Sequence, residues 1–182
     1  MKFELLDSET LFTGRAFSIR RDKLRTPDGH TTKFDIIEHH GSVVLLPIDD
    51  DGNLLFVRQY RHAAAEDLLE LPAGTLDGPD EAPQDCAARE IREETGMAAG
   101  KLIELGEFFL VPGYSTERMT VFLATELSFD PLDPDADEFL EVEKIPLADA
   151  LKMAETGQIP DAKSLASLLL ARPHLASFLQ SG

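Results

Sequence analysis

Alternating apolar and polar residues predict a β-hairpin near the start of the chain. Residues 17–26 and 30–40 interleave β-branched and aromatic side chains with charged ones, and a Pro-Asp-Gly sequence separates the two segments. This alternation is typical of strands with one buried face, and Pro-Asp-Gly favours a tight turn. We therefore expect residues 1–40 to form an antiparallel β segment ahead of a main domain at residues 41–182.

The rest of the chain predicts a mixed sheet with helices. Residues 42–48 are nearly all apolar, as in a strand that is covered on both faces. Further strands are expected at 54–61, 101–111 and 118–127, and helices at 147–157 and 161–173. Because strands and helices follow no regular βαβ alternation, the pattern favours an α+β fold, with a sheet sandwiched between helices, over a doubly wound sheet.

One further helix carries the candidate chemistry. Pro83 suits a first helical turn and Gly96 suits the position after the last turn, which predicts a helix over residues 83–95. Its carboxylates at i, i+3 and i+4 share one face, and they are Glu90, Glu93 and Glu94. Like charges placed in this way destabilise a helix unless a hard cation such as Mg²⁺ lies between them.

Neighbouring residues on the same helix have different expected environments. Arg89 lies one turn before Glu93 and is expected to hold that carboxylate in place. Ala87 and Ile91 fall on another face and are expected to pack into the core. The single cysteine, Cys86, is interpreted as a buried structural thiol rather than a reactive one.

Taken alone, the three glutamates would indicate no more than a solvated acidic helix. They belong, however, to a longer pattern, with a Pro-Ala-Gly turn at 72–74, Glu81 eight residues before Arg89, and an unbroken REIREETGM. This pattern resembles the Nudix family signature, G-x5-E-x7-R-E-U-x-E-E-x-G-U, where U is apolar. Every fixed position from Glu81 to Met97 matches, although six residues rather than five separate Gly74 from Glu81.

The resemblance extends beyond the signature. Four further segments are similar to a subgroup that cleaves ADP-ribose and nucleotide sugars. They are LELPAG before the signature, FVRQYR on the preceding strand, VPGYSTE after the signature and the late DADEFLEVEKIPLADAL. It implies a Nudix fold, with a mixed sheet in an α/β/α sandwich and an N-terminal antiparallel β segment. It also implies Mg²⁺-dependent hydrolysis of ADP-ribose to AMP and ribose 5-phosphate, with Mn²⁺ able to replace Mg²⁺. Other nucleoside-diphosphate sugars, such as GDP-mannose or UDP-glucose, are the leading alternative substrates.

The resemblance assigns roles to individual residues. The metal ligands would be the carboxylates of Glu90, Glu93 and Glu94 and the carbonyl oxygen of Ala73. The catalytic residues would be Glu93, Arg89 and Glu138, with Glu138 or Glu93 as general base. Arg61 would contact the diphosphate, because its planar guanidinium suits a phosphate, and Phe34, Tyr60 and Glu117 are further substrate-binding candidates.

Net charge narrows the choice of partners. The chain has 17 Lys and Arg against 34 Asp and Glu, a formal net charge of −17, of which residues 1–61 carry only −1. So acidic a surface argues against long nucleic acids and anionic membranes, which need extended cationic patches. A small diphosphate remains a suitable ligand if the acidic residues recruit cations. The near-neutral, arginine-bearing first third suits the homodimer that the subgroup implies, whose N-terminal strands would reach the partner's site.

Two other classes of function remain open. A regulator that binds a nucleotide sugar without cleaving it would be expected to lose signature glutamates, and an acidic interaction module would show no turnover. His39, His40 and His62 lack partners at metal-ligand spacing and are interpreted as surface or structural residues. The first residues resemble no signal peptide and no apolar run is long enough to span a bilayer, so we expect a cytoplasmic protein.

Overall fold

A computed structural model of the chain describes residues 2–133, 139–176 and 178–180. Its elements are β1 (Glu4–Thr13), β2 (Ser18–Arg25), β3 (Thr31–Glu38), β4 (Ser42–Pro47), β5 (Asn53–Arg61), β6 (Glu66–Glu70), β7 (Ala73–Thr75), α1 (Pro83–Thr95), β8 (Met97–Phe109), β9 (Arg118–Phe129), β10 (Leu140–Pro146), α2 (Leu147–Glu155) and α3 (Ala162–Ala171), with short 3₁₀ turns at Arg172–His174 and Phe178–Gln180. This mixture of strands and helices confirms the α+β expectation.

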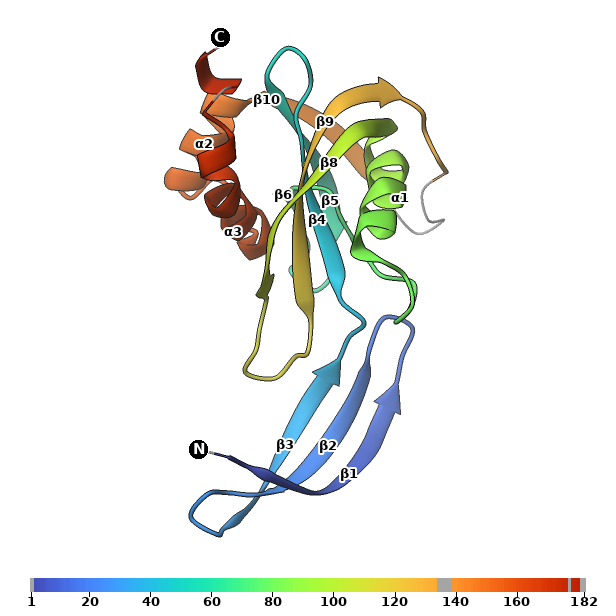
Figure 1. The fold of residues 1–182 in the computed structure, drawn as a ribbon, viewed down its shortest axis with the longest axis vertical. Helices are drawn as coiled ribbons and strands as arrows, with labels where there is room; N and C mark the ends of the chain where they lie inside the picture. The colour runs from blue at the N-terminus through green and yellow to red at the C-terminus, as the bar shows by residue number, and fades with distance from the viewer. Residues whose placement is uncertain (1, 134–138, 177, 181–182) are drawn as a thin grey trace.

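Two sheets form the main body, with helices on both sides (Figure 1). One sheet has the strand order β7-β4-β9-β8 and the other has the order β10-β5-β6. The pair β4 and β9 is parallel, whereas the other pairs within these two sheets are antiparallel. In Figure 1, α1 lies on one side of the sheets and α2 and α3 lie on the other. This arrangement agrees with the expected sandwich.

The strand β4 shows why its sequence is almost entirely apolar. Val44 and Leu46 belong to the core cluster that includes residues of α2 and α3. Val43 and Leu45 belong to a second cluster, together with Ala87 and Ile91 of α1. Because successive side chains of a strand point to opposite faces, a strand between two helical layers needs apolar residues at every position. The prediction of a strand covered on both faces is confirmed.

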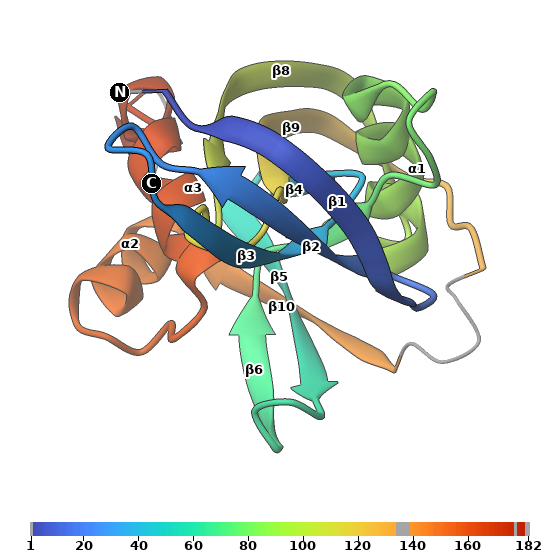
Figure 2. The ribbon, with the colours of Figure 1, turned by 90° about the horizontal axis from the view of Figure 1, so that it is seen from below.

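The N-terminal residues form a separate three-stranded antiparallel sheet, β1-β2-β3. Figure 2 shows it as a layer in front of the main body when the molecule is viewed from below. The hairpin of β2 and β3 was predicted, whereas β1 lies within the expected β segment but was not assigned as a strand of its own. Every residue of β1 is exposed, and its pairing with β2 shifts register between Leu5 and Asp7 and between Thr10 and Phe12. Such bulges interrupt the two-residue alternation from which a strand is predicted.

The helix α1 spans Pro83–Thr95, as predicted, and Gly96 ends it with a φ of 72°. This left-handed conformation is one that glycine adopts without strain. Cys86 is fully buried, and burial raises the pKa of its thiol, as expected for an unreactive side chain. The strands β6, β7 and β10 were not predicted. No helix in the described ranges is long and apolar enough to cross a bilayer.

Candidate active site

Arg89 lies at the centre of a group of carboxylates from α1 and from the loop that precedes it. Its Nη1 donates to Glu90 at 2.7 Å and to Glu93 at 2.9 Å, which confirms that Arg89 holds the Glu93 carboxylate. Nε and Nη2 each donate to the Glu81 carboxylate at 3.3 Å, and Nη2 also donates to the Thr75 carbonyl. Burial alone would lower the pKa of Arg89, but its hydrogen bonds to Glu81 and Glu90 raise it. The guanidinium is therefore a permanent positive charge among three carboxylates.

The loop between Gly74 and Glu81 keeps its contact with α1 despite its extra residue. The Glu81 carboxylate accepts a hydrogen bond from the backbone N–H of Asp77 at 2.7 Å, in addition to those from Arg89. Burial alone would raise the pKa of Glu81, but these hydrogen bonds lower it. The carboxylate thus ties the loop to the helix in its ionised form.

Gly74 leaves the space that the Glu90 carboxylate occupies. A Cβ atom at position 74 would lie 1.8 Å from Cδ of Glu90 and 1.9 Å from its Oε1. No side chain fits there unless the carboxylate moves. The glycine at the start of the signature segment is therefore required by the close approach of a side chain from α1.

Glu94 has a different environment from its neighbours on the helix. Its side chain is 5% exposed, and one carboxylate oxygen accepts a hydrogen bond from the backbone N–H of Ala73 at 2.8 Å. Ala73, Glu90 and Glu93 line a common cavity of about 620 Å³. The structure thus places Ala73 next to the glutamate face of α1.

Arg61 lines the same cavity and is held by a second group of charges. Its Nε and Nη2 donate to the carboxylate of Glu70 at 2.9 and 2.6 Å. The Lys163 ammonium also bonds to Glu70, and it donates to Asp161 at 3.0 Å. The hydrogen bond to Glu70 raises the pKa of Arg61, so the guanidinium stays charged. A cationic group therefore faces the cavity that contains Glu90 and Glu93.

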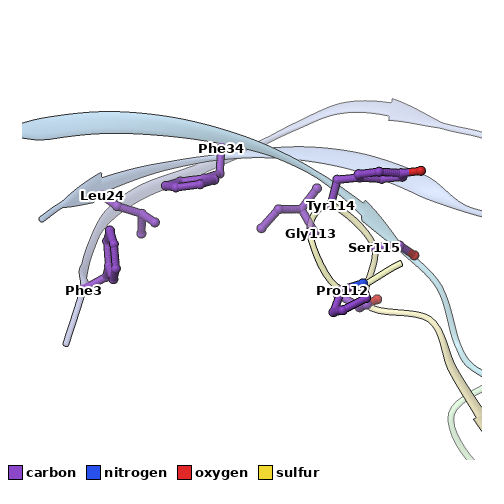
Figure 3. A pocket seen from close by; sticks show the side chains of 9 residues that line it. Phe3, Leu24, Phe34, Pro112, Gly113, Tyr114 and Ser115 are labelled. Atoms are coloured by element: carbon purple, nitrogen blue, oxygen red, sulfur yellow. The ribbon is translucent and has the colours of Figure 1, made fainter. Parts of the chain in front are cut away.

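The other substrate-binding candidates are spread over the molecule. Glu117 lines the cavity and accepts a hydrogen bond from the Ser42 hydroxyl at 3.0 Å. Phe34 lies in a separate apolar cavity of about 390 Å³, between the N-terminal sheet and the loop that carries Tyr114 (Figure 3). Tyr60 is 53% exposed and lies outside the lining of both cavities, and the centroid of its ring is 6.3 Å from that of His62.

Several residues that line the large cavity were not singled out from the sequence. They are Glu70, Asp161 and Lys163, together with Arg15 and Ala16 from the turn between β1 and β2. His40, which was interpreted as a surface or structural residue, also lines this cavity. Asp161 could have been found as the cap of a predicted helix, since its carboxylate accepts a bond from Ser164 N–H. Nothing local to Glu70 or Lys163 indicates that they meet, because they are 93 positions apart.

The donor set suits a hard divalent cation by its chemistry. Carboxylates and a backbone carbonyl are the ligands that Mg²⁺ prefers, and Glu90 and Glu93 already line the cavity beside Ala73. Within the described ranges no three His, Cys, Asp or Glu side chains are arranged as a ready metal site. The Glu90 and Glu93 carboxylates are instead bonded to Arg89. Glu138 lies outside the residues that the structure describes.

Comparison with known proteins defines the class. Residues 38–168 match the model of the NUDIX domain family. The chain is 37% identical over 158 residues to the ADP-ribose pyrophosphatase of Bacillus subtilis (strain 168), covering 86% of this chain and 85% of that protein. It is 38% identical over 181 residues to the ADP-ribose pyrophosphatase of Mycobacterium tuberculosis (strain ATCC 25618 / H37Rv), covering 98% of this chain and 87% of that protein.

A solved structure supports the same assignment. The crystal structure of an ADP compounds hydrolase matches with a TM-score of 0.85 and 27% sequence identity, over 97% of this chain and 96% of that chain. The chain therefore belongs to the Nudix family. The expected Nudix fold and the expected hydrolase class are confirmed, and hydrolases of this family generally need a divalent metal ion.

Proposed function

We propose that this Nudix hydrolase cleaves the diphosphate of ADP-ribose to AMP and ribose 5-phosphate, with Mg²⁺ as its metal ion and Mn²⁺ as a substitute. One juxtaposition carries the proposal: Glu90 and Glu93 line the same cavity as Arg61. A set of oxygen donors for a hard cation and a guanidinium for a phosphate thus lie within one cavity. Similarity to two ADP-ribose pyrophosphatases over most of the chain supports ADP-ribose as the substrate.

The proposed metal ligands are Glu90, Glu93, Glu94 and the carbonyl oxygen of Ala73. When bound, a divalent cation lowers the pKa of a coordinated water and offsets the charge of the diphosphate. Arg89 holds the Glu90 and Glu93 carboxylates at the cavity and limits their mutual repulsion. Gly74 leaves the room in which the Glu90 carboxylate lies.

The remaining roles concern the substrate and the proton. Arg61 binds the diphosphate in this proposal, because its charged guanidinium faces the cavity. Glu117 contributes a carboxylate to the same cavity, while Phe34 and Tyr60 are the candidates for contact with the base. Glu138 is the proposed acceptor of the proton of the attacking water, with Glu93 as the alternative.

We also propose that residues 1–40 mediate homodimer formation and that the protein acts in the cytoplasm. Large apolar side chains of this segment are more than a third exposed, and they are Phe3, Leu5, Leu6, Leu11, Phe12, Phe17 and Phe34. So many exposed apolar groups on one small sheet favour a protein partner. A second copy would also explain how Phe34, which lies outside the Glu93 cavity, could contact a substrate. Light scattering coupled to gel filtration measures the mass directly.

Other nucleoside-diphosphate sugars, such as GDP-mannose and UDP-glucose, are the alternative substrates. A non-catalytic nucleotide-sugar regulator is disfavoured because every fixed signature position from Glu81 to Met97 is present. The decisive experiment is a hydrolysis screen of ADP-ribose, GDP-mannose, UDP-glucose, diadenosine polyphosphates and nucleoside triphosphates, with and without Mg²⁺, compared by kcat/KM. A highest kcat/KM for another substrate would replace ADP-ribose in the proposal.

The variant Glu93→Gln tests the site itself. We expect a loss of at least about a hundredfold in kcat with an unchanged Tm, because an amide binds a hard cation poorly. Glu107→Gln is the matched control, since Glu107 pairs with Arg118 on the surface and is absent from the lining of both cavities. Retention of most of the rate by Glu93→Gln would overturn the proposed metal site.

A further inference from the structure

Four charged side chains from three elements form a network in the wall of the large cavity. Arg61 comes from β5, Glu70 from the end of β6, and Asp161 and Lys163 from the start of α3. Glu70 and Lys163 are 2% and 8% exposed, respectively. Each side chain bonds to at least one other, in the order Arg61, Glu70, Lys163 and Asp161.

The bonding geometry fixes the orientation of the Arg61 guanidinium. Glu70 takes one side of the planar group, through Nε at 2.9 Å and Nη2 at 2.6 Å. A bidentate contact of this kind defines the plane and the direction of a guanidinium, which a single hydrogen bond does not. Nη1 makes no hydrogen bond to any described residue, so its donors remain available for a ligand in the cavity.

The partner of Arg61 is itself held firmly by α3. Lys163 contacts the Glu70 carboxylate, and Leu71, the residue that follows β6, donates its backbone N–H to the Ser164 hydroxyl at 2.7 Å. Asp161 caps the helix through Ser164 N–H at 3.0 Å. Two successive residues are thus attached to the first turn of α3, so the position of Glu70 depends on that helix.

The network contains two cations, Arg61 and Lys163, and two anions, Glu70 and Asp161. Because the Glu70 carboxylate is shared between Arg61 and Lys163, its charge does not act on Arg61 alone, and the guanidinium can still attract a phosphate. Asp161 is placed at a helix N-terminus, where backbone N–H groups stabilise negative charge. Buried ion networks seldom add net stability compared with apolar side chains, so a role in the site is the better explanation for this one.

We propose that Glu70 and Lys163 are positioning residues for Arg61, so that α3, outside the family signature, takes part in binding the diphosphate. The inference rests on the proposed function, since it assumes that Arg61 contacts that diphosphate. It predicts that loss of either residue weakens substrate binding through Arg61 and leaves the chemical step nearly unchanged.

The test combines steady-state kinetics with binding in the absence of metal. We expect Glu70→Gln to raise KM for ADP-ribose, and Kd for ADP-ribose measured by calorimetry in EDTA, by about tenfold, with kcat changed less than about threefold. Lys163→Met is expected to raise both constants to a smaller extent, and Lys163→Arg to restore them. If Glu70→Gln fails to fold, as a thermal scan would reveal, the two Lys163 variants decide the question.

A double-mutant cycle separates positioning from a general loss of structure or charge. In an Arg61→Ala background, Glu70→Gln and Lys163→Met should raise Kd by less than about twofold further, because the group they position is gone. The inference would be overturned if the rise in Kd in the double variant equalled the product of the rises in the two single variants. It would also be overturned if Glu70→Gln kept the KM and Kd of the wild type. Glu143→Gln is the matched control, since it removes the carboxylate partner of another β5 arginine, Arg58, outside the cavity.

The outcome distinguishes this inference from the proposed function. If the wild-type enzyme hydrolyses no nucleoside diphosphate, the proposed function fails and the inference fails with it. If ADP-ribose is hydrolysed and Arg61→Ala impairs its binding, while Glu70→Gln and Lys163→Met behave as wild type, the inference alone is overturned.

Discussion

Two arginines line the same cavity and differ in how their donors are used. Arg89 donates hydrogen bonds to protein oxygens through Nε, Nη1 and Nη2, and its side chain is 25% exposed. Arg61 donates hydrogen bonds to Glu70 through Nε and Nη2, and its side chain is 40% exposed. Its Nη1 makes no hydrogen bond to any described residue. The difference indicates that Arg89 organises the carboxylates of the site, whereas Arg61 is available to a ligand.

The largest expected effect comes from removing the arginine whose donors are all engaged. In Arg89→Met, the carboxylates of Glu81, Glu90 and Glu93 lose their shared cation. We expect kcat to fall by about a hundredfold, because Glu90 and Glu93 are no longer held at the cavity. We also expect a loss of about 2 kcal/mol in the free energy of unfolding, since partly buried carboxylates are left unpaired.

Urea unfolding and steady-state kinetics measure both effects. Arg61→Ala provides the contrast, since it should act mainly on KM and metal-free ligand affinity rather than on kcat. If Arg89→Met raised only KM and preserved both kcat and the free energy of unfolding, the division of roles between the two arginines would be contradicted.

A smaller effect is expected from Gly74→Ala, which disturbs only the Arg89 side of the cavity. The new Cβ would lie 1.8 Å from Cδ of Glu90, so that flexible side chain must swing away while the backbone stays in place. We expect kcat to fall by about tenfold to a hundredfold with little change in Tm. Affinity for ADP-ribose in EDTA should persist, because Arg61 and Glu70 are not displaced.

Gly78→Ala is the control for this change within the same loop. A Cβ at Gly78 would meet no atom within 4 Å, so its activity should equal that of the wild type. Full activity of Gly74→Ala would mean that the position of the Glu90 carboxylate does not matter for the reaction.

The sequence predicts the contacts around Arg89 better than the contacts around Arg61. The bond from Arg89 to Glu93 follows from the helical spacing of four residues, so the sequence alone predicts it. The bond from Lys163 to Glu70 joins residues 93 positions apart and depends on how α3 packs against the sheets. No local pattern encodes that packing, and in the sequence Glu70 is only one residue of the LELPAG segment.

The same distinction applies to the fold. The strand β4 was predicted because both of its faces are buried, so that every residue after Ser42 is apolar. The strand β1 was missed because it is exposed throughout and because two bulges break its alternation. The separation of Phe34 from the Glu93 cavity depends on how the N-terminal sheet is placed, which no residue of that sheet specifies by itself.

The smallest expected effect is a pH dependence of stability that differs between the Glu70 and Glu81 carboxylates. Burial alone would raise the pKa of Glu70, but Arg61 and Lys163 lower it below its ordinary value of 4.5. A carboxyl whose pKa is lowered in the folded state stabilises the protein above its ordinary pKa, and the contribution is lost as pH falls through the folded pKa. The Tm of wild type should therefore exceed that of Glu70→Gln by a few degrees near about pH 7, and the gap should shrink below about pH 4. Glu81→Gln should show the same trend with a smaller gap, because Glu81 is 17% exposed and Glu70 only 2%. Thermal scans across this pH range measure both gaps, and a gap for Glu70→Gln that stays constant would show that its ionised form does not stabilise the fold.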